Sequence, residues 1–266
     1  MRGRLVVCPT PIGNLEDVTL RVLRVLGDAD VIACEDTRHT RKLLDRHGIG
    51  GARLVSHHEH NERARAGELA ARIESGEIVA LVTDAGTPAV SDPGFVLLRE
   101  CVARGLDVEV LPGPSAAVTA LVASALPVDR WRFSGFLPRK AGELRAELER
   151  GEETLVAFES PGRLPKTLAL LAKIDPQRPV AMCRELTKLH EEVVRGPARE
   201  VAERFAEGAR GEIVLVIGPA DAAAVDAGRA HEAVEALVEA GARRRAAARV
   251  VSQLTGVPAN DLYRPR

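Results

Sequence analysis

Short apolar segments alternate with longer segments of helical periodicity through the first 125 residues of the chain. The apolar segments hold few polar residues, which is typical of strands that are covered on both faces. They predict strands at residues 5–8, 30–34, 53–55, 78–83 and 108–111. Apolar residues at helical spacing predict helices between them, at residues 18–27, 38–47, 62–74, 95–104 and 115–125. This alternation favours a parallel α/β sheet.

A second series of strands and helices follows a segment at 124–130 that reads as a linker. The pattern predicts strands at 131–136, 154–158, 179–183, 191–194 and 213–217, and helices at 140–150, 164–172 and 199–207. The predicted strand that ends at residue 183 and the one that begins at residue 191 are too close in sequence to hold a helix between them. We therefore expect a mixed second sheet, because a parallel pair needs a longer crossover connection.

The last part of the chain, from residue 220, has no strand pattern. Apolar residues at helical spacing predict helices at 229–239 and 243–254, with a short helical turn at 257–260. From Gly241 onward the sequence holds six Arg and one Asp. We expect a basic helical appendage with a helix–turn–helix arrangement. The predicted fold class is thus α/β, with α/β domains at 1–123 and 124–219 and a helical appendage at 220–266.

The charge balance excludes a polycationic protein and limits any nucleic-acid surface to a local patch, since the net charge of the 266 residues is −1. Four separate cysteines without a C-x-x-C pair indicate buried, reduced thiols in a cytosolic protein. The segment before Pro9 is too short for a secretory leader, and no apolar run approaches the ~18 residues of a membrane span. We expect a cytoplasmic protein that does not enter the membrane.

Three loops at predicted strand ends are candidates for a ligand site. They are P-T-P-I-G-N-L-E-D at 9–17, D-A-G-T-P-A-V-S-D-P-G at 84–94 and P-G-P-S-A at 112–116. Ligands of open α/β sheets bind outside the carboxyl ends of the strands, and small residues let the backbone approach them closely. Each loop also has a plainer interpretation as a stiff connector: Ser91 or Asp92 is expected to cap the next helix, and Pro114 suits a first helical position. The chain has no Walker loop, G-x-G-x-x-G fingerprint or G-x-S-x-G elbow.

Charged residues gather at other strand ends, in E-D-T-R-H-T at 35–40, H-E-H-N-E at 58–62, F-E-S-P-G-R at 158–163 and R-E-L-T-K-L-H-E-E at 184–192. His57, His58, Glu59 and His60 could suggest a metal, but they lack the spaced ligand pattern of zinc sites. No metal is predicted. A polar lining for a substrate site is favoured, and surface ion pairs of small energetic weight are the alternative.

Together these segments and the tail L-T-G-V-P-A-N-D-L-Y at 254–263 resemble the tetrapyrrole methylase superfamily and, within it, the ribosomal RNA small subunit methyltransferase I family. The resemblance covers essentially the whole chain in order. The loop at Pro9–Gly13 differs from the G-x-G-P-G-D of the cobalamin- and haem-pathway members, which argues against a tetrapyrrole substrate.

The resemblance implies two α/β domains with S-adenosylmethionine in the cleft between them, and a homodimer. It implies 2′-O-methylation of the ribose of cytidine 1402 in 16S ribosomal RNA, with the small ribosomal subunit as the partner. Alternatives are a methyltransferase acting on a tetrapyrrole or another small molecule, and a non-catalytic RNA-binding assembly factor. The implied cofactor contacts are Asp84, Ala85, Gly86, Thr87, Val90, Ser115, Ala116, Phe158 and Arg184.

A ribose hydroxyl is a weak nucleophile and needs a base within hydrogen-bond reach. Glu35 and Glu185 are the first candidates, ahead of Asp36, His58, Glu59 and Lys188. Cations would hold the RNA phosphates. The predicted substrate residues are Arg38, His58, Glu59, Arg163, Lys188, Arg243, Arg244, Arg245 and Arg249, although the four in the appendage also suit a solvated helix face.

Overall fold

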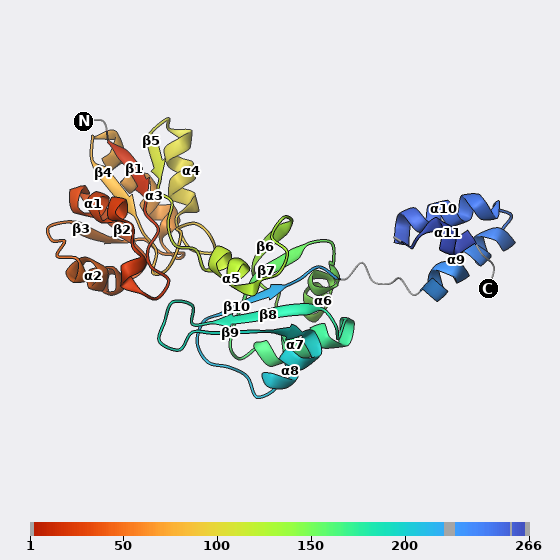
Figure 1. Ribbon diagram of the computed structural model, residues 1–266. Coiled ribbons are helices and arrows are strands. Elements are labelled where there is room, and N and C mark those ends of the chain that lie inside the picture. The colour runs from red at the N-terminus through yellow and green to blue at the C-terminus, as the bar shows by residue number, and fades with distance from the viewer. Residues whose placement is uncertain (1–2, 221–226, 256, 264–266) are drawn as a thin grey trace.

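Two α/β units and a group of three helices make up the computed structural model, which describes residues 3–220, 227–255 and 257–263. Figure 1 shows the first unit, which holds the N-terminus, joined through one helix to the second, with the three C-terminal helices beyond it. The predicted fold class is confirmed: two α/β sheets with helices and a helical C-terminal part.

The first sheet is parallel throughout, as predicted. Its strands are β1 (Arg4–Val7), β2 (Val31–Cys34), β3 (Arg53–Ser56), β4 (Ile78–Leu81) and β5 (Asp107–Val110). They lie in the order β3-β2-β4-β1-β5, and every pairing between neighbours is parallel. Because successive side chains of a strand point to opposite faces, the apolar residues of β1 and β2 belong alternately to two hydrophobic cores, one on each face of the sheet.

Helices cover both faces of this sheet. One core packs α3 (Glu62–Glu74) and α4 (Phe95–Ala103) against Leu5, Val7 and their neighbours. The other packs α1 (Leu20–Asp28) and α2 (Thr37–Arg46) against Val6, Cys8 and theirs. Thr19 caps α1 by accepting a hydrogen bond from the Val22 N–H at 3.1 Å, and a short 3-10 helix, η1 (Leu15–Asp17), precedes it. The sequence pattern did not predict this 3-10 turn.

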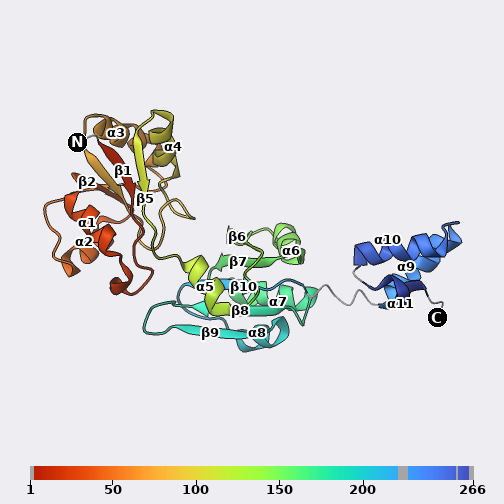
Figure 2. The same ribbon diagram turned by 45° about the horizontal axis from the view of Figure 1, so that its top comes forward.

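The second sheet is mixed, as predicted. It consists of β6 (Trp131–Phe136), β7 (Thr154–Glu159), β10 (Ile213–Ile217), β8 (Pro179–Arg184) and β9 (Glu192–Pro197), in that spatial order. Only β6 and β7 pair in parallel, and the other neighbours are antiparallel. On one face lie α6 (Ala141–Glu149), α7 (Leu164–Ile174) and α8 (Ala198–Arg204), packed around Leu155, Met182 and Leu215. Figure 2 shows this layer from another side.

The opposite face of the second sheet is covered by α5 (Ala116–Ser124). Ala117, Ala120 and Leu121 of this helix pack on Val156, Ala181 and Val216, strand residues of the second sheet. Along the chain α5 directly follows the loop after β5, so the helix links the two units while its apolar side belongs to the second core. The predicted division at residues 123 and 124 stays a prediction.

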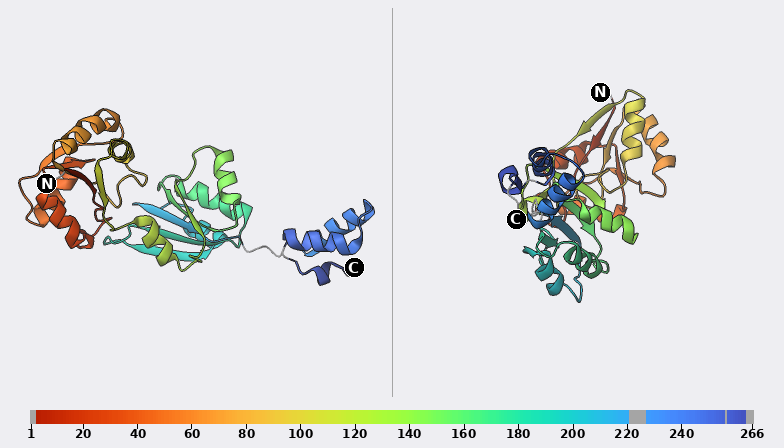
Figure 3. Two further views of the ribbon diagram at one scale, coloured as in Figure 1. Left: turned by 90° about the horizontal axis from the view of Figure 1, so that it is seen from above. Right: turned by 90° about the vertical axis from the view of Figure 1, so that its right-hand side faces the viewer.

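The three C-terminal helices are α9 (Ala227–Glu239), α10 (Arg244–Thr255) and α11 (Ala259–Tyr263). They enclose a small core of their own, built by Ala230, Val234, Ala247, Ala248, Val251 and Leu262. Figure 3 shows the group beyond the second sheet. The predicted helices at 229–239 and 243–254 lie within a residue or two of α9 and α10, and the predicted turn at 257–260 begins two residues ahead of α11.

All four cysteines are buried and unpaired. Burial raises the pKa of Cys8 to about 12 and the pKa values of Cys101 and Cys183 to about 11, so these groups are thiols at neutral pH. Among the residues described, no helix is both long and apolar enough to cross a membrane.

Candidate active site

Two loops meet where the connections of the first sheet diverge. β1 and β4 are neighbours, but the chain leaves β1 through α1 on one face and leaves β4 through α4 on the other. Such a divergence opens a crevice at the carboxyl ends of the strands. The Thr10 N–H donates to the Gly86 oxygen at 2.9 Å, and the Gly86 N–H donates back to the Thr10 oxygen at 3.0 Å. This reciprocal pair joins the two loops.

The loop after β5 closes onto the same place. The Thr87 hydroxyl donates to the Pro114 carbonyl oxygen at 3.1 Å. Ser115 is the N-cap of α5, with its hydroxyl accepting from the Val118 N–H, so Pro114 stands outside the helix and not at its first position as predicted. The N–H groups of Ala116 and Ala117 have no acceptor within the described part of the chain. The first turn of α5 is therefore open to a ligand.

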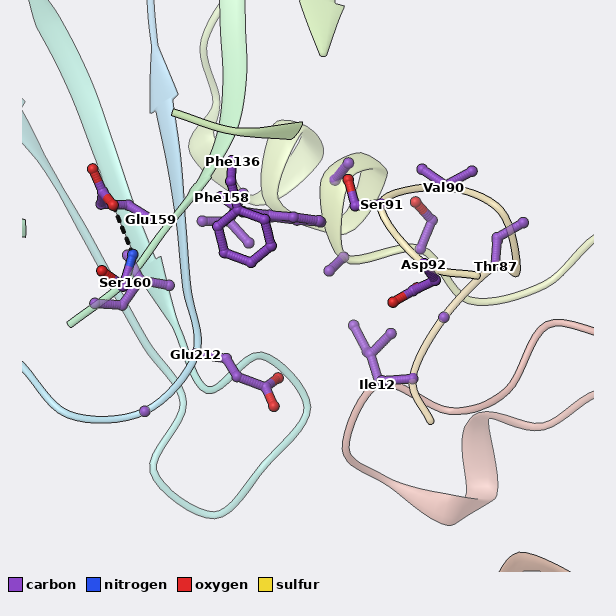
Figure 4. A pocket seen from close by; sticks show the side chains of 18 of the residues that line it. Ile12, Thr87, Val90, Ser91, Asp92, Phe136, Phe158, Glu159, Ser160 and Glu212 are labelled. Carbon is purple, nitrogen blue, oxygen red and sulfur yellow. Dashed lines mark hydrogen bonds between the residues drawn. The ribbon is translucent and has the colours of Figure 1, made fainter. Parts of the chain in front are cut away.

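A cavity of about 390 Å³ lies between these loops and the second sheet. Figure 4 shows Thr87, Val90 and Asp92 on one side, Phe158, Glu159 and Ser160 on the other, and Ile12 and Glu212 below. Both units thus contribute walls. The lining residues are Ile12, Ala85, Gly86, Thr87, Val90, Ser91, Asp92, Ser115, Ala116, Ala117, Phe136, Phe158, Glu159, Ser160, Pro161, Gly211, Glu212, Ile213 and Val214.

The predicted cofactor residues divide into two groups. The first group lines the cavity and consists of Ala85, Gly86, Thr87, Val90, Ser115, Ala116 and Phe158. Asp84 and Arg184 are not among the lining residues: Asp84 accepts a hydrogen bond from the Asp36 N–H at 3.1 Å, and Arg184 pairs with Glu192 at 2.7 Å. Asp84 thus binds a backbone group of the protein and Arg184 binds a side chain, and neither faces the cavity.

A group of carboxylates lies at the edge of the first sheet beside the cavity. The Thr83 hydroxyl donates to Glu35 Oε2 at 3.1 Å. Burial raises the pKa of Asp92 to about 6, and the negative charges of Glu35 and Asp84 add to this effect. Asp92 lines the cavity, whereas Glu35 is not among the lining residues. Neither Asp92 nor Ser91 caps α4, contrary to the expectation from sequence, because Gly94 occupies the N-cap without a side-chain bond.

Glu185, the second predicted base, is bound by ion pairs and hydrogen bonds. Its Oε1 accepts from Lys188 Nζ at 3.0 Å and from the Glu212 N–H at 2.9 Å. The bond from the Glu212 backbone is the main cause that lowers the pKa of Glu185, and Lys188 adds to it. Lys188 Nζ also pairs with Glu212 Oε2 at 3.1 Å. Glu185 therefore packs beneath the cavity wall at Gly211 and Glu212 and does not line the cavity.

The loop that follows β8 touches the first unit directly. The Asn14 N–H donates to the Thr187 hydroxyl at 3.0 Å. A Cβ placed on Gly13 would come within 2.5 Å of Lys188 Cγ, so only glycine fits there without a shift. Glu185 and Thr187 have φ of 51° and 65°, in the left-handed region that costs non-glycine residues energy. The site thus stores backbone strain where the two units meet.

The predicted RNA residues of the two sheets have different surroundings. Arg38 is exposed and pairs with Asp36 at 2.9 Å, and Glu59 is exposed as well. His58 Nε2 lies 3.3 Å from Asn61 Nδ2. Arg163 donates to the carbonyl oxygens of Leu137 and Pro138 at 2.9 and 2.6 Å and pairs with Glu159, so it supports the fold. Within the described residues no group of His, Cys, Asp and Glu is arranged to hold a metal.

Three of the four predicted appendage arginines are exposed: Arg243, Arg245 and Arg249. Arg244 differs, because its guanidinium pairs with Glu235 of α9, with Nη1 at 2.7 Å from the carboxylate. It holds α10 against α9.

Several lining residues were not singled out as site residues from the sequence. Ile12 and Asp92 both lie in loops that were predicted to bind a ligand, although Asp92 was assigned a capping role. The sequence could therefore have indicated both residues. Gly211–Val214 and Phe136 carried no such signal, because they come to the cavity through the pairing of β10 and β6 with β7. Glu159 ends β7, and Ser160 and Pro161 follow it in the F-E-S-P-G-R segment.

Comparison with known proteins places the chain in a family. A family model described as Tetrapyrrole (Corrin/Porphyrin) Methylases matches residues 4–202. A protein of Mesorhizobium japonicum named "Ribosomal RNA small subunit methyltransferase I" is 47% identical over 83% of this chain and 76% of its own length. A protein of the same name from Escherichia coli O157:H7 is 42% identical over 99% of this chain and 94% of its own length.

Solved structures share the fold at lower identity. A uroporphyrin-III C-methyl transferase from Thermus thermophilus, complexed with S-adenyl homocysteine, superposes with a TM-score of 0.57 at 22% identity, over 81% of this chain and 97% of that one. The methyltransferase CobJ gives 0.61 at 22% identity, over 82% of this chain and 95% of that one. The family model covers the first sheet and the second sheet up to β9, and it ends before β10. The relative from Escherichia coli O157:H7, which covers 99% of this chain, extends the match into the C-terminal part. The chain belongs to the tetrapyrrole methylase superfamily and, within it, to the ribosomal RNA small subunit methyltransferase I family.

Proposed function

We propose that this protein transfers a methyl group from S-adenosylmethionine to the ribose 2′-oxygen of cytidine 1402 in 16S ribosomal RNA. The observation that carries the proposal is the near full-length similarity to relatives named for a methyltransferase of small-subunit ribosomal RNA. The position on the RNA and the 2′-oxygen follow from the resemblance of the loop motifs to that family. A ribosomal substrate also implies a cytoplasmic protein.

The cavity fits S-adenosylmethionine in size and lining. Its volume of about 390 Å³ lies within the ~300–1,000 Å³ of small-molecule sites. Ile12, Val90 and Phe158 offer apolar surface for an adenine ring, and the backbone of Ala85–Thr87 offers polar groups at close approach. The free N–H groups of Ala116 and Ala117 at the start of α5 suit the carboxylate of the methionyl part.

When bound, S-adenosylmethionine supplies a methyl carbon activated by its positive sulfur. The protein holds the ribose oxygen in line with that carbon and removes the hydroxyl proton. Asp92 is the best placed base, because it lines the cavity and its pKa of about 6 leaves it ionised but basic at neutral pH. Glu35 supports Asp92 in this role, because its negative charge raises the pKa of Asp92. The Thr83 hydroxyl orients the carboxylate of Glu35.

Glu185 has a positioning role in this proposal. Its carboxylate binds the Glu212 N–H and Lys188, and it thereby fixes the Gly211–Glu212 segment that lines the cavity. Arg38, His58 and Glu59, which follow β2 and β3, keep their predicted role as contacts of the RNA substrate in this proposal. The exposed appendage cations Arg243, Arg245 and Arg249 are available to bind phosphates at a distance from the cavity.

The proposal includes a homodimer and the small ribosomal subunit as partner. Large apolar side chains are exposed in both units, among them Phe95 at 56% and Val122 at 70%. Association surfaces cover side chains of this kind. Sedimentation of the purified protein at several concentrations tests the dimer, and a monomer at all of them would contradict it.

Transfer of labelled methyl groups tests the reaction. Wild-type protein is incubated with S-adenosylmethionine carrying a tritiated methyl group and small subunits from a strain that lacks this enzyme, and the labelled nucleotide is mapped. We expect a single 2′-O-methylcytidine at position 1402. Label elsewhere in the RNA would overturn the assigned position. No label, with cofactor binding seen by calorimetry, would favour a small-molecule substrate, and no cofactor binding would favour a non-catalytic assembly factor.

A further inference from the structure

A second hollow lies on the helical side of the second sheet, between α6 and α7. It encloses about 640 Å³. We call it the α6–α7 groove and define it by its five cationic lining residues, Arg139, Arg145, Arg163, Lys166 and Lys173. No carboxylate belongs to its lining. The sequence pattern did not single out this surface, because its cations are spread over 35 residues and meet only when α6 packs on α7.

Three of these five cations are available to a ligand. Arg145 pairs with Glu149 at 2.7 Å, and Arg163 is held by Glu159 and two carbonyl oxygens. The side chains of Arg139, Lys166 and Lys173 have no hydrogen bond or ion pair within the described part of the chain. In a protein whose net charge is −1, three unpaired cations around one hollow form a local positive field.

The floor of the α6–α7 groove is apolar. Leu144 of α6 and Leu170 of α7 line it, together with small alanine and glycine residues. Cations on a rim above an apolar floor fit a polymer that alternates anionic groups with flat or aliphatic ones. A nucleic-acid strand has this composition, with phosphates along its backbone and ribose and base faces between them.

One hydrogen bond links the α6–α7 groove to the candidate cofactor cavity. Thr167 lines the groove, and its hydroxyl donates to Glu159 Oε2 at 2.6 Å. Glu159 in turn lines the cavity, as do Ser160 and Pro161, which precede Arg163 on the turn into α7. The groove lies on the α6–α7 face of the second sheet and the cavity on the α5 face, so this hydrogen bond connects the two sites through the end of β7.

We propose that the α6–α7 groove binds the phosphate backbone of the ribosomal RNA substrate. The inference rests on the proposed function for the identity of the RNA, but the groove itself is defined by its charge and shape. It adds a contact surface in the second unit to the exposed cations of the appendage.

Two triple variants of the full chain test the proposal. The groove variant carries Arg139→Gln, Lys166→Gln and Lys173→Gln. The control carries Arg24→Gln, Arg46→Gln and Arg63→Gln, which remove the same charge from exposed positions on α1, α2 and α3. Binding to 16S ribosomal RNA transcribed in vitro is measured at several salt concentrations, and calorimetry with S-adenosylmethionine shows whether the cofactor site is intact.

We expect the groove variant to bind RNA about tenfold more weakly at low salt, with a salt slope smaller by about 2, because three phosphate contacts are lost. The control should change by less than about twofold, and both should bind cofactor like wild type. In the methylation assay the groove variant should raise KM and leave kcat unchanged. Unchanged RNA affinity of the groove variant would overturn the proposal.

Other outcomes separate this proposal from the proposed function. If the wild type binds RNA but transfers no methyl group, the proposed function fails, while the comparison of the two variants still decides on the groove. If free RNA binds equally to the groove variant and the wild type but small subunits bind the variant more weakly, a ribosomal protein occupies the groove. That result would overturn the assignment to RNA.

Discussion

Thr10 and Gly86 exchange two backbone hydrogen bonds, of 2.9 and 3.0 Å, across the crevice at which the connections after β1 and β4 diverge to opposite faces of the first sheet. The pair belongs to no strand of the sheet, yet it fixes the spacing between the loops after β1 and β4. Gly86 makes these bonds with φ of +83°, a conformation that side chains oppose. The wall of the cavity therefore depends on one glycine.

Gly86→Val tests that dependence. A Cβ at this position would lie 3.5 Å from Ile12 Cγ2, an ordinary contact, so the cost comes from the backbone. We expect a loss of about 1–3 kcal/mol in the free energy of unfolding, together with weaker cofactor binding, measured by denaturant unfolding and calorimetry. Gly27→Ala in α1, where nothing lies within 4 Å of an added Cβ, is the control and should not destabilise the protein. Equal stability of Gly86→Val and wild type would contradict this account.

Asp92 should govern the acid limb of the pH profile. With a pKa near 6, the rate of methyl transfer at low substrate should rise as the pH passes 6. Asp92→Asn should lower it by about 10²–10⁴-fold. Glu35→Gln removes a charge that raises the pKa of Asp92, so the limb should move to lower pH. Glu16→Gln, on the η1 turn, is the matched control. If the acid limb does not move in Glu35→Gln, the charge of Glu35 does not influence the pKa of Asp92.

The same carboxyl makes stability depend on pH with a definite sign. Its pKa rises from 3.8 in the unfolded chain to about 6 in the folded protein, so the folded state holds the proton more tightly. Stability conferred by this group is present below pH 4 and is lost as the pH rises through 6. We expect Asp92→Asn to flatten this part of the stability curve, measured by urea unfolding between pH 4 and 8. An unchanged slope would show that other groups produce it.

We expect Arg163 to contribute mainly to the stability of the fold and less to RNA binding. Glu159 is fully buried, and Arg163 is its ion-pair partner at 3.4 Å. Removing one member of a buried pair leaves an uncompensated charge, so Arg163→Met should cost about 3 kcal/mol in unfolding free energy. Arg139→Met, on the rim of the α6–α7 groove, should stay within about 0.5 kcal/mol of wild type. A stable Arg163→Met protein with weak RNA binding would restore the role predicted from sequence.

The appendage arginines should divide in the same way. Arg244 is bound to Glu235, and Arg244→Met should loosen the contact between α9 and α10, measured by limited proteolysis. Arg243→Gln, Arg245→Gln and Arg249→Gln remove exposed charges and should instead lower RNA affinity and its salt dependence. Proteolysis of this triple variant at the wild-type rate is the control. Unchanged RNA affinity in it would leave these arginines as a solvated helix face.

The sequence predicted the fold more fully than the site, for physical reasons. Uniformly apolar strands and amphipathic helices leave a periodic signal, and the predicted elements match the observed ones within a few residues. Loops such as 84–94 carry unusual small residues and were found. Phe136 and Val214 reach the cavity through strand pairing, which depends on register and is not local in sequence. Glu185 was nominated for its charge, but only the structure shows that Lys188 and the Glu212 backbone bind it.

The packing of α5 on the second sheet limits how this protein can be divided for experiments. A fragment that ends after α5 would expose Ala117, Ala120 and Leu121 to water, and the remaining fragment would expose Val156, Ala181 and Val216. Both pieces would carry an uncovered apolar surface and tend to aggregate. A cut ahead of α5 would keep the second core intact but would separate Ser115 and Ala116 from Gly86 and Thr87. Expression as separate halves therefore sacrifices either solubility or the cofactor cavity.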